Sequence, residues 1–282
     1  MTTLRAWRRQ IRNGLPTILG FTRRGFFIPY RHANSVDAQG RAYAPIETLF
    51  EANTQIFAEW LFRAEAFKAA FLDIGATPPP EPRWRQDWFP RLDAAMAYVV
   101  TRVEKPARIV EIGSGHSTRF FARAVRDENL STEISAIDPA PRADLDDLAT
   151  IKLHRVLVQD GPEAVFTALE PGDILSIDSS HILMPGSDVD YLLNRILPIL
   201  PTGVIVHIHD MFLPDSYPEN WEWRGYNEQL GVSALLNSGG WTPLFSSQFV
   251  LTRMKAAFEN SIISTLPLEK GALESGLWLK KE

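Results

Sequence analysis

After Pro106 the sequence alternates short β-branched runs with segments of helical periodicity, and this alternation restricts the fold more than any other feature. Such alternation is typical of βαβ units, which build a parallel sheet covered by helices. The predicted strands are 108–112, 133–137, 151–158, 174–177 and 203–208, and the predicted helices are 117–126, 162–169, 188–200 and 227–237. Two closing strands are predicted over 241–251 and 276–280. The sequence therefore predicts a doubly wound α/β fold, mostly parallel with an antiparallel closing strand.

The first 104 residues lack strand patterns and are predicted to form helices and loops. Apolar residues recur at three- and four-residue spacing over 45–73, which predicts an amphipathic helix. The proline-rich stretch over 77–82 would end that helix, and a second helix is predicted over 90–103. We therefore expect a basic arm and helical cap over 1–104 and a ligand-binding domain over 105–282.

Charge is distributed unevenly along the 282 residues. The chain carries a net charge of -5, yet seven arginines and no acidic residue precede Asp37. The remaining body is acidic, which argues against nucleic acid as a partner, because neutralising phosphates needs clustered Lys and Arg. The basic arm could contact a membrane surface, a partner or an anionic ligand, and a solvated tail is its simplest interpretation.

Two absences narrow the chemistry. The chain has no cysteine, which excludes thiolate nucleophiles, cysteine metal sites and disulfides. It also has no run of about eighteen apolar residues and no apolar stretch of the kind that marks a secretory signal. We expect a cytoplasmic protein without a membrane span, and a homodimer is the default assembly for such a domain.

A glycine-rich turn follows the first predicted strand. The run 108–118 reads RIVEIGSGHST, with Ser114 between Gly113 and Gly115. Glycines let a backbone approach a ligand closely, and a helix N-terminus offers free N–H groups to an anion. A dinucleotide-binding turn would need a third glycine where Thr118 stands, which disfavours a nicotinamide cofactor. A turn with only a structural purpose is the alternative.

This segment resembles motif I of the class I S-adenosylmethionine-dependent methyltransferases, in which an acidic residue, here Glu111, precedes a G-x-G turn. The resemblance implies a Rossmann-like sheet with S-adenosyl-L-methionine as cofactor. The implied cofactor-binding set is Glu111, Gly113, Ser114, Gly115, Ser117, Thr118, Asp138, Asp160 and Asp178. Ser117 would hold the methionine carboxylate, Asp138 the ribose hydroxyls and Asp160 the adenine amino group.

Polar residues also follow the fourth and fifth predicted strands. Asp178-Ser179-Ser180-His181 ends one strand, and His209-Asp210 ends the next. Ligands of open α/β sheets bind beyond the carboxyl ends of the strands, so these groups should meet there. Burying several ionisable groups together is costly unless they are paired or bound to a ligand. The sequence therefore predicts a second polar cluster beside the glycine turn.

Two roles for this cluster remain open. Its plan resembles the catechol-type O-methyltransferases, which implies Asp178 and Asp210 as ligands of magnesium or manganese. Met211 stands where another ligand is usual; His181 or His209 could replace that ligand, which would shift the preference from magnesium toward manganese, iron or zinc. Alternatively, His181 or His209 could be the general base, since an imidazole pKa near ~6.5 suits proton removal at neutral pH. The predicted catalytic set is His181, His209, Asp178 and Asp210, whereas His207, His116 and His154 are expected to be structural or surface residues.

Most of the chain resembles a group of bacterial methyltransferase-like proteins that share the D-S-S-H and H-I-H-D strand tips. The resemblance implies methyl transfer to a hydroxyl, less readily an amine, of a small-molecule acceptor. A non-catalytic cofactor-binding module or sensor is the alternative, and a nicotinamide-dependent oxidoreductase is the third. Rings that could wall the acceptor site, or instead pack the N-terminal helices onto the sheet, are Tyr217, Trp221, Trp223, Tyr226, Trp84, Trp88 and Phe89.

Overall fold

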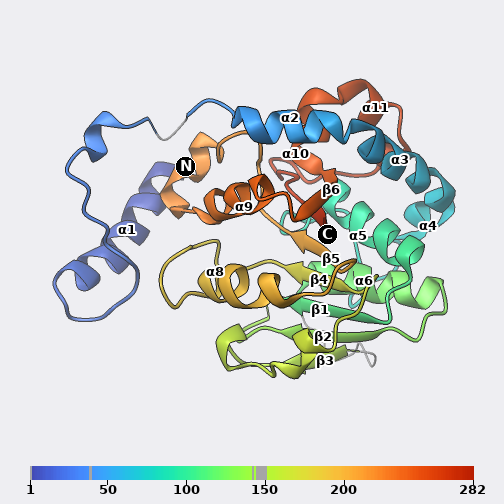
Figure 1. Ribbon diagram of the computed structural model, residues 1–282, viewed down its shortest axis with the longest axis horizontal. Helices are drawn as coiled ribbons and strands as arrows, with labels where there is room; N and C mark the ends of the chain where they lie inside the picture. The colour runs from blue at the N-terminus through green and yellow to red at the C-terminus, as the bar shows by residue number, and fades with distance from the viewer. Residues whose placement is uncertain (1, 38–39, 142, 144–150) are drawn as a thin grey trace.

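The computed structural model describes residues 2–37, 40–141, 143 and 151–282. Its centre is a seven-stranded sheet with strand order β3-β2-β1-β4-β5-β7-β6 (Figure 1). Strands β1 to β5 are parallel, and β7 runs antiparallel to both β5 and β6. The strands are β1 Arg108–Ile112, β2 Glu133–Ile137, β3 Ile151–His154, β4 Ile174–Ile177, β5 Ile205–Ile208, β6 Trp241–Ser246 and β7 Leu277–Lys281. This is the predicted α/β fold with its antiparallel closing strand.

The helices precede the sheet and connect its strands. Their bounds are α1 Thr2–Ile18, α2 Ala44–Ala52, α3 Thr54–Ala64, α4 Lys68–Asp73, α5 Arg91–Glu104, α6 His116–Asp127, α7 Ala164–Thr167, α8 Asp188–Tyr191, α9 Glu228–Asn237, α10 Ser247–Arg253 and α11 Lys255–Glu259. Before residue 105 the described residues contain helices and loops, as expected. Within the described chain, no helix combines the length and the apolar character needed to cross a bilayer.

Three predicted strands begin or end two or more residues from their predicted bounds, and the predicted strand 276–280 is shifted by one residue to Leu277–Lys281. The predicted strand 151–158 stops at His154, because its only neighbour β2 ends at Ile137, which pairs with His154. The predicted strand 241–251 ends at Ser246, whose side chain accepts a hydrogen bond from the N–H of Phe249 and so caps α10. The predicted strand 203–208 begins at Ile205, two residues after Gly203, which has a φ of 90°.

Two predicted helices are interrupted. The predicted helix over 45–73 is three helices, and its first break is at Asn53, whose side-chain amide donates to the carbonyl of Leu49. The predicted helix over 188–200 is a short α-helix followed by a π-helical turn over Leu192–Ile196 and a 3₁₀ turn over Leu197–Ile199. Pro198 lies in that last turn and has no N–H to continue an α-helix.

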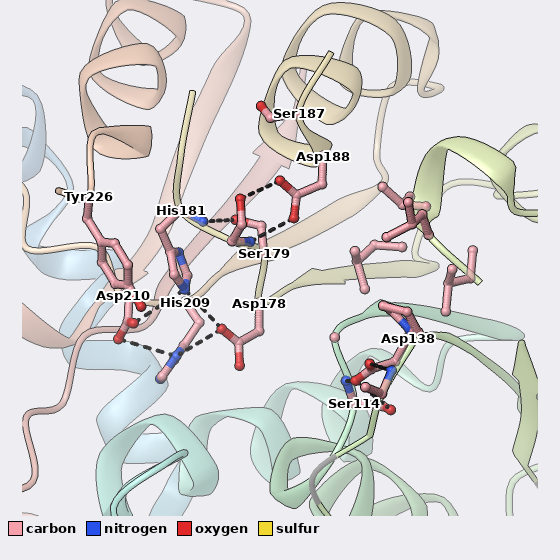
Figure 2. A pocket seen from close by; sticks show the side chains of 18 of the residues that line it. Ser114, Asp138, Asp178, Ser179, His181, Ser187, Asp188, His209, Asp210 and Tyr226 are labelled. Atoms are coloured by element: carbon pink, nitrogen blue, oxygen red, sulfur yellow. Dashed lines mark hydrogen bonds and ion pairs between the residues drawn. The ribbon is translucent and has the colours of Figure 1, made fainter. Parts of the chain in front are cut away.

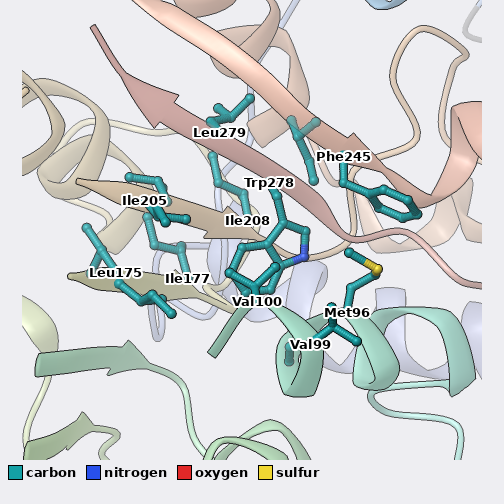
Figure 3. Packing of buried hydrophobic residues seen from close by; sticks show 14 of the residues in the cluster. Met96, Val99, Val100, Leu175, Ile177, Ile205, Ile208, Phe245, Trp278 and Leu279 are labelled. Carbon is teal, nitrogen blue, oxygen red and sulfur yellow. The ribbon is translucent and has the colours of Figure 1, made fainter. Parts of the chain in front are cut away.

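The core joins the N-terminal helices directly to the sheet. Trp278 of β7 is fully buried, and Figure 3 shows it between β5 on one side and Val99, Val100 and Met96 of α5 on the other. Burial of large apolar side chains is the main favourable contribution to folding. The packing fixes α5 against the sheet, and the first turn of α5 carries Asp93 to the site described below.

The turn after β1 requires glycine. Gly113 has a φ of 75°, and a Cβ at this position would overlap the carbonyl oxygen of Asp178. The N–H of Asp178 donates to the carbonyl of Ile112 over 2.8 Å, so the end of β4 is held against this turn. The close approach brings the glycine turn and the polar end of β4 to one place.

We expect Gly113→Ala to lower the free energy of unfolding by about 3 kcal/mol or more, since it adds an overlap to the cost of a left-handed backbone. Gly239→Ala is the matched control, because Gly239 has a φ of 78° but open space where a Cβ would lie. The control should lose only about 1–3 kcal/mol from the backbone conformation. Urea unfolding measures both, and equal losses would contradict the tight packing of β4 on the turn.

Candidate active site

A cavity of about 570 Å³ lies at the carboxyl ends of the parallel strands. The loops that follow β1, β2, β4 and β5 all contribute to it, as is usual for ligand sites in open α/β sheets. One half is formed by the glycine turn and the end of β2, and the other by the predicted catalytic residues (Figure 2).

The cofactor half centres on Asp138, which follows β2. Its carboxylate accepts hydrogen bonds from the N–H of Ser114 over 2.7 Å and from the hydroxyl of Ser114 over 3.2 Å. It also accepts from the N–H of Ala140 over 2.8 Å. Gly113, Ser114 and Asp138 all line the cavity. The predicted turn and the predicted ribose-binding acid are therefore brought together.

Glu111 lies behind the turn rather than in the cavity. It is buried and accepts a hydrogen bond from the hydroxyl of Thr118 over 2.5 Å, while that hydroxyl accepts from the N–H of Gly115. Burial raises the pKa of Glu111 to about 8. Ser117 is also buried, and neither it, Gly115, Thr118 nor Glu111 lines the cavity. These four predicted cofactor residues therefore belong to the turn and its support and do not face the cavity.

Asp160 is not at the end of a strand, in contrast to the prediction. Because β3 stops at His154, Asp160 falls in a 3₁₀ turn over Val158–Asp160, where it is exposed and outside the cavity lining. The residue before it, Gln159, does line the cavity and donates its amide N–H to the carbonyl of Gly186 over 3.0 Å. The amide oxygen of Gln159 is buried without a hydrogen-bond partner. A buried acceptor of this kind fits an amino group of a bound ligand.

The catalytic half contains His181, held between carboxylates. Its Nδ1 lies 2.8 Å from Glu228, and its Nε2 lies 3.2 Å from Asp178 and 3.4 Å from Asp210. The ring also packs against Tyr226, with the two ring centroids 4.5 Å apart. Burial alone would lower the pKa of His181, but the hydrogen bonds to Asp178 and Glu228 raise it well above its ordinary value.

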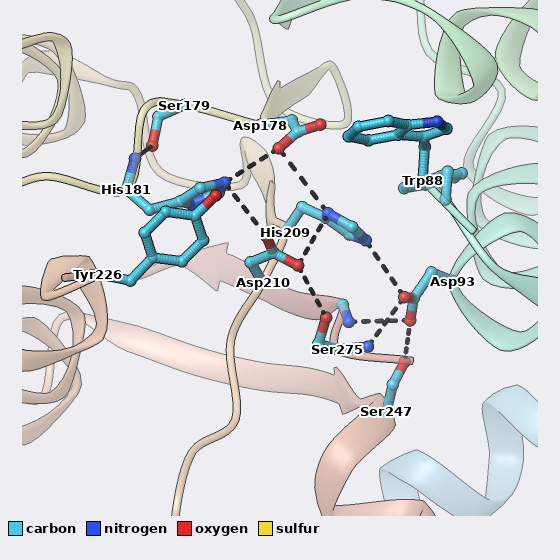
Figure 4. Close-up of polar contacts among 12 residues, drawn as sticks. Trp88, Asp93, Asp178, Ser179, His181, His209, Asp210, Tyr226, Ser247 and Ser275 are labelled. Carbon is cyan, nitrogen blue, oxygen red and sulfur yellow. Dashed lines mark hydrogen bonds and ion pairs between the residues drawn. The ribbon is translucent and has the colours of Figure 1, made fainter. Parts of the chain in front are cut away.

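His209 is held differently at its two nitrogens. Nε2 lies 3.3 Å from the carboxylate of Asp93, whereas Nδ1 lies 3.5 Å from Asp210 and 3.8 Å from Asp178 (Figure 4). Burial opposes the charged imidazolium, yet the charge of Asp210 and the hydrogen bonds to Asp178 and Asp93 raise the pKa of His209 well above its ordinary value. Nε2 of His209 is thus hydrogen-bonded to buried Asp93, whereas Nδ1 lies at longer distances from Asp178 and Asp210, which line the cavity.

The pKa values of Asp178 and Asp93 are shifted downward, in contrast to those of His181 and His209. Burial would raise the pKa of Asp178, but its contacts with His181 and His209 lower it. Asp93 is fully buried and accepts from the hydroxyl of Ser247 and the N–H groups of Ser275 and Gly276, and with His209 these bonds overcome burial and lower its pKa. The pKa shifts therefore favour ionised Asp178 and Asp93 beside charged His181 and His209.

Backbone geometry supports a functional site here. His181 has a φ of 60° and Asp210 a φ of 55°. Such left-handed backbone is uncommon for non-glycine residues and concentrates at functional sites. The carbonyl of His181 accepts hydrogen bonds from the N–H groups of Asn227 and Glu228. These bonds hold His181 against the start of α9.

The predicted metal site does not fit this arrangement. The carboxylates of Asp178 and Asp210 face imidazole nitrogens, which does not suit magnesium, because magnesium prefers a shell of oxygen ligands. In the part of the chain that the structure describes, no group of three or more His, Asp or Glu residues could hold a metal ion. The two histidines occupy the position between the carboxylates that a cation would take.

The predicted aromatic wall is formed in part. Trp88, Trp221 and Tyr226 line the cavity, together with Phe26 of the N-terminal arm and Arg224. Trp84 instead packs in the core against Phe71 and Phe120, Phe89 packs against His207 and His209, and Tyr217 and Trp223 do not line the cavity. Arg224 stacks on Trp221 with its guanidinium carbon 4.0 Å from the ring centroid.

The three histidines that were expected to be structural or surface residues do not line the cavity. His207 is fully buried, hydrogen-bonded to Ser176 and stacked on Trp278. His116 and His154 do not line the cavity. The sequence analysis gave no role to Asp93 or Glu228. For Asp93 the sequence did contain a signal, because an acidic residue within the apolar run of α5 indicates a buried and partnered charge.

Comparison with known proteins gives one family match. Residues 110–211 match the family model of a methyltransferase domain, a range that runs from β1 past His209 and Asp210. No curated protein matches the sequence significantly.

Three solved structures are similar at low identity. A Podospora anserina methyltransferase, PaMTH1, bound to S-adenosylhomocysteine (SAH), is 15% identical over 92% of this chain and 99% of that chain, with a TM-score of 0.43. A Bacillus cereus O-methyltransferase in complex with SAH is 11% identical over 84% and 100%, with a TM-score of 0.45. The Streptomyces achromogenes O-methyltransferase TomG is 15% identical over 79% and 89%, with a TM-score of 0.41.

We expect Glu228→Gln to lower the pKa of His181, because it removes the charged partner of Nδ1. NMR titration of the imidazole signals measures this, and the pKa of His209 should change less. A raised histidine pKa stabilises the fold below about pH 6.5 and ceases to do so as the pH rises through the folded-state pKa. The variant should therefore lose about 1.5–3 kcal/mol of unfolding free energy at pH 6, and less at higher pH.

Glu222→Gln is the control for this variant, because Glu222 is exposed on the preceding loop. It should leave both the imidazole pKa values and the unfolding free energy unchanged. An unchanged His181 pKa in Glu228→Gln would contradict the proposed network.

Proposed function

We propose that this chain, whose residues 110–211 match the family model of a methyltransferase domain, transfers a methyl group from S-adenosylmethionine (SAM) to a hydroxyl group of a small molecule. The observation that carries the proposal is the asymmetric setting of His209, tied to buried Asp93 at Nε2 and open toward the cavity-lining carboxylates at Nδ1. The ring is oriented as a general base requires.

Asp138, the glycine turn and Gln159 would hold the cofactor. Asp138 lies about where the acid that grips ribose hydroxyls is found in folds of this plan. The partnerless amide oxygen of Gln159 suits the amino group of an adenine. When bound, SAM supplies a methyl group already activated on a sulfonium sulfur. The protein therefore mainly has to align the acceptor, and alignment can contribute roughly 7–11 kcal/mol.

Proton removal from the acceptor is assigned to His209. In its neutral form Nε2–H donates to Asp93, so the lone pair is on Nδ1 and can accept the hydroxyl proton. Asp93 then stabilises the imidazolium that forms. This is the orienting role that a buried acid plays beside a catalytic histidine.

Asp178, Asp210 and His181 position the acceptor. The Asp178 side chain is 36% exposed, against 12% for Asp210 and 4% for His181 and His209, so Asp178 is the most accessible acceptor of a hydrogen bond from the substrate. His181, anchored by Glu228, holds both carboxylates in place. Trp88, Trp221 and Tyr226 exclude water from the acceptor half.

We expect calorimetry to show SAH binding with one site per chain and unchanged affinity in EDTA, since no step of this proposal uses a metal. Asp138→Asn should weaken binding about tenfold, because it removes a charged hydrogen-bond acceptor. Asp160→Asn is the matched control and should bind normally, because Asp160 is exposed outside the cavity. Binding of NADH in place of SAH would overturn the cofactor assignment, and loss of SAH binding in EDTA would restore the metal.

We expect His209→Gln to lower kcat by about 10²–10⁴-fold in an acceptor panel of phenols and sugars, because a general base is lost. His154→Gln is the control outside the cavity. In the native enzyme kcat should rise with increasing pH, since the pKa of His209 is raised and only its neutral form can accept a proton. Asp210→Asn should shift this rise to lower pH, because it removes the neighbouring charge that stabilises the imidazolium.

Two results would count against the base assignment. Unchanged turnover in His209→Gln would exclude it directly. SAH binding without methylated product for any acceptor, in a protein with an intact His209, would favour a non-catalytic cofactor-binding module.

A further inference from the structure

The N-terminal helix α1 does not bury its apolar face against the rest of the protein. It contacts the 3₁₀ segment Glu219–Arg224, and Figure 1 shows it at the side of the molecule, away from the sheet. Among the residues of α1 whose side chains the structure describes, the half-buried ones are Asn13, Gly14, Pro16 and Thr17, which present no large apolar side chain. A surface helix of a globular protein normally buries its apolar stripe instead.

The apolar residues of α1 form one exposed stripe. Leu4, Trp7, Ile11, Leu15 and Ile18 recur every three or four residues and so share one helix face. Trp7 is 58% exposed, Ile11 43% and Leu15 53%. Exposed apolar side chains continue beyond the helix at Phe21, Phe27 and Ile28. Contiguous exposed apolar surface of this kind marks an interaction site.

The charge of the arm identifies the partner. Seven arginines and no acidic residue precede Asp37, whereas the rest of the chain is acidic. Arg8 and Arg12 are exposed on α1 beside the apolar stripe. An apolar face combined with basic flanks is typical of helices that lie in the interface of an anionic bilayer.

We infer that the arm over residues 2–31 binds the surface of an anionic lipid bilayer, with the apolar stripe of α1 at the level of the headgroups. Nucleic acid would pair with the arginines but would leave the apolar stripe in water. A second copy of this chain would cover the stripe but would bring two arms of seven arginines together. Of these three partners, the lipid surface is the one that satisfies both features. The same arm contributes Phe26 to the cavity, so the lipid-binding segment and the catalytic site are continuous.

The test is co-sedimentation of the full chain with vesicles. We expect binding to vesicles of equal parts phosphatidylcholine and phosphatidylglycerol, and at least tenfold weaker binding to phosphatidylcholine alone. Salt at about 0.5 M should weaken binding to the anionic vesicles, because it screens the arginines. This readout does not depend on methyl transfer, so it can fail independently of the proposed function.

Two variants divide the contributions. The triple variant Trp7→Glu, Ile11→Glu and Leu15→Glu should lose binding by at least tenfold. The triple variant Arg8→Gln, Arg12→Gln and Arg24→Gln should lose the preference for anionic vesicles. The matched control is Phe62→Glu, Leu72→Glu and Leu230→Glu, which changes three comparably exposed apolar residues elsewhere and should bind normally. Thermal unfolding checks that each variant is folded.

Three results would overturn the inference. The first is absence of binding to anionic vesicles, and the second is equal loss of binding in the control variant. The third is a lipid-free dimer on size-exclusion chromatography that Trp7→Glu, Ile11→Glu and Leu15→Glu converts to monomer, since the stripe would then be a surface between copies.

Discussion

Pairing of buried charge is the constraint on which this structure depends. Asp93, Asp210 and Glu228 are buried with His181 and His209, and none of these groups would tolerate its position alone. Each imidazole lies between carboxylates, and each carboxylate has an imidazole or backbone N–H groups as partners. Breaking such a network leaves an unpaired charge in a low-dielectric interior, which is costly. The polar ends of β4 and β5 can therefore exist only with the helices that partner them.

The partners come from both ends of the chain. Asp93 lies in the first turn of α5 and accepts from the N–H groups of Ser275 and Gly276, just before β7. In return Glu274 accepts from the side chain of Arg91 and the N–H of Leu92. The N-terminal helices are thus joined to the closing strand at the point where His209 is oriented. The helical segment before residue 105 completes the site, and the segment 110–211 that matches the methyltransferase-domain model does not contain all of it.

The sequence predicted what local pattern determines. Strands β1, β2 and β4 were predicted to the residue, because central parallel strands are short apolar runs with sharp ends. The meeting of Asp178, His181, His209 and Asp210 was also predicted, since strand order alone brings strand ends together. The end of β3 was not, because it is set by where β2 stops, and that is a tertiary fact. Asp160 was misplaced for the same reason.

The roles of Asp93 and Glu228 depend on long-range packing and could not be read from periodicity. Both are acids near the starts of helices, where negative charge is ordinary because it opposes the helix dipole. Only the fold shows that Asp93 turns inward to His209, which follows it by 116 residues, and that Glu228 turns inward to His181. The position of an acidic residue in a helix pattern therefore does not show whether the residue is buried or which group it pairs with. Both depend on the fold.

The same partners account for the misfit of the predicted metal. A divalent cation would neutralise Asp178 and Asp210 from one point, and the two imidazolium ions neutralise them from two. Both arrangements balance the negative charge of the two carboxylates. A histidine can also release and accept a proton, whereas a metal ion itself carries none. Under the proposed function, His209 must therefore lose its proton before it can accept one from an acceptor hydroxyl. The proposed methyl transfer would then become faster as the pH rises and His209 loses its proton.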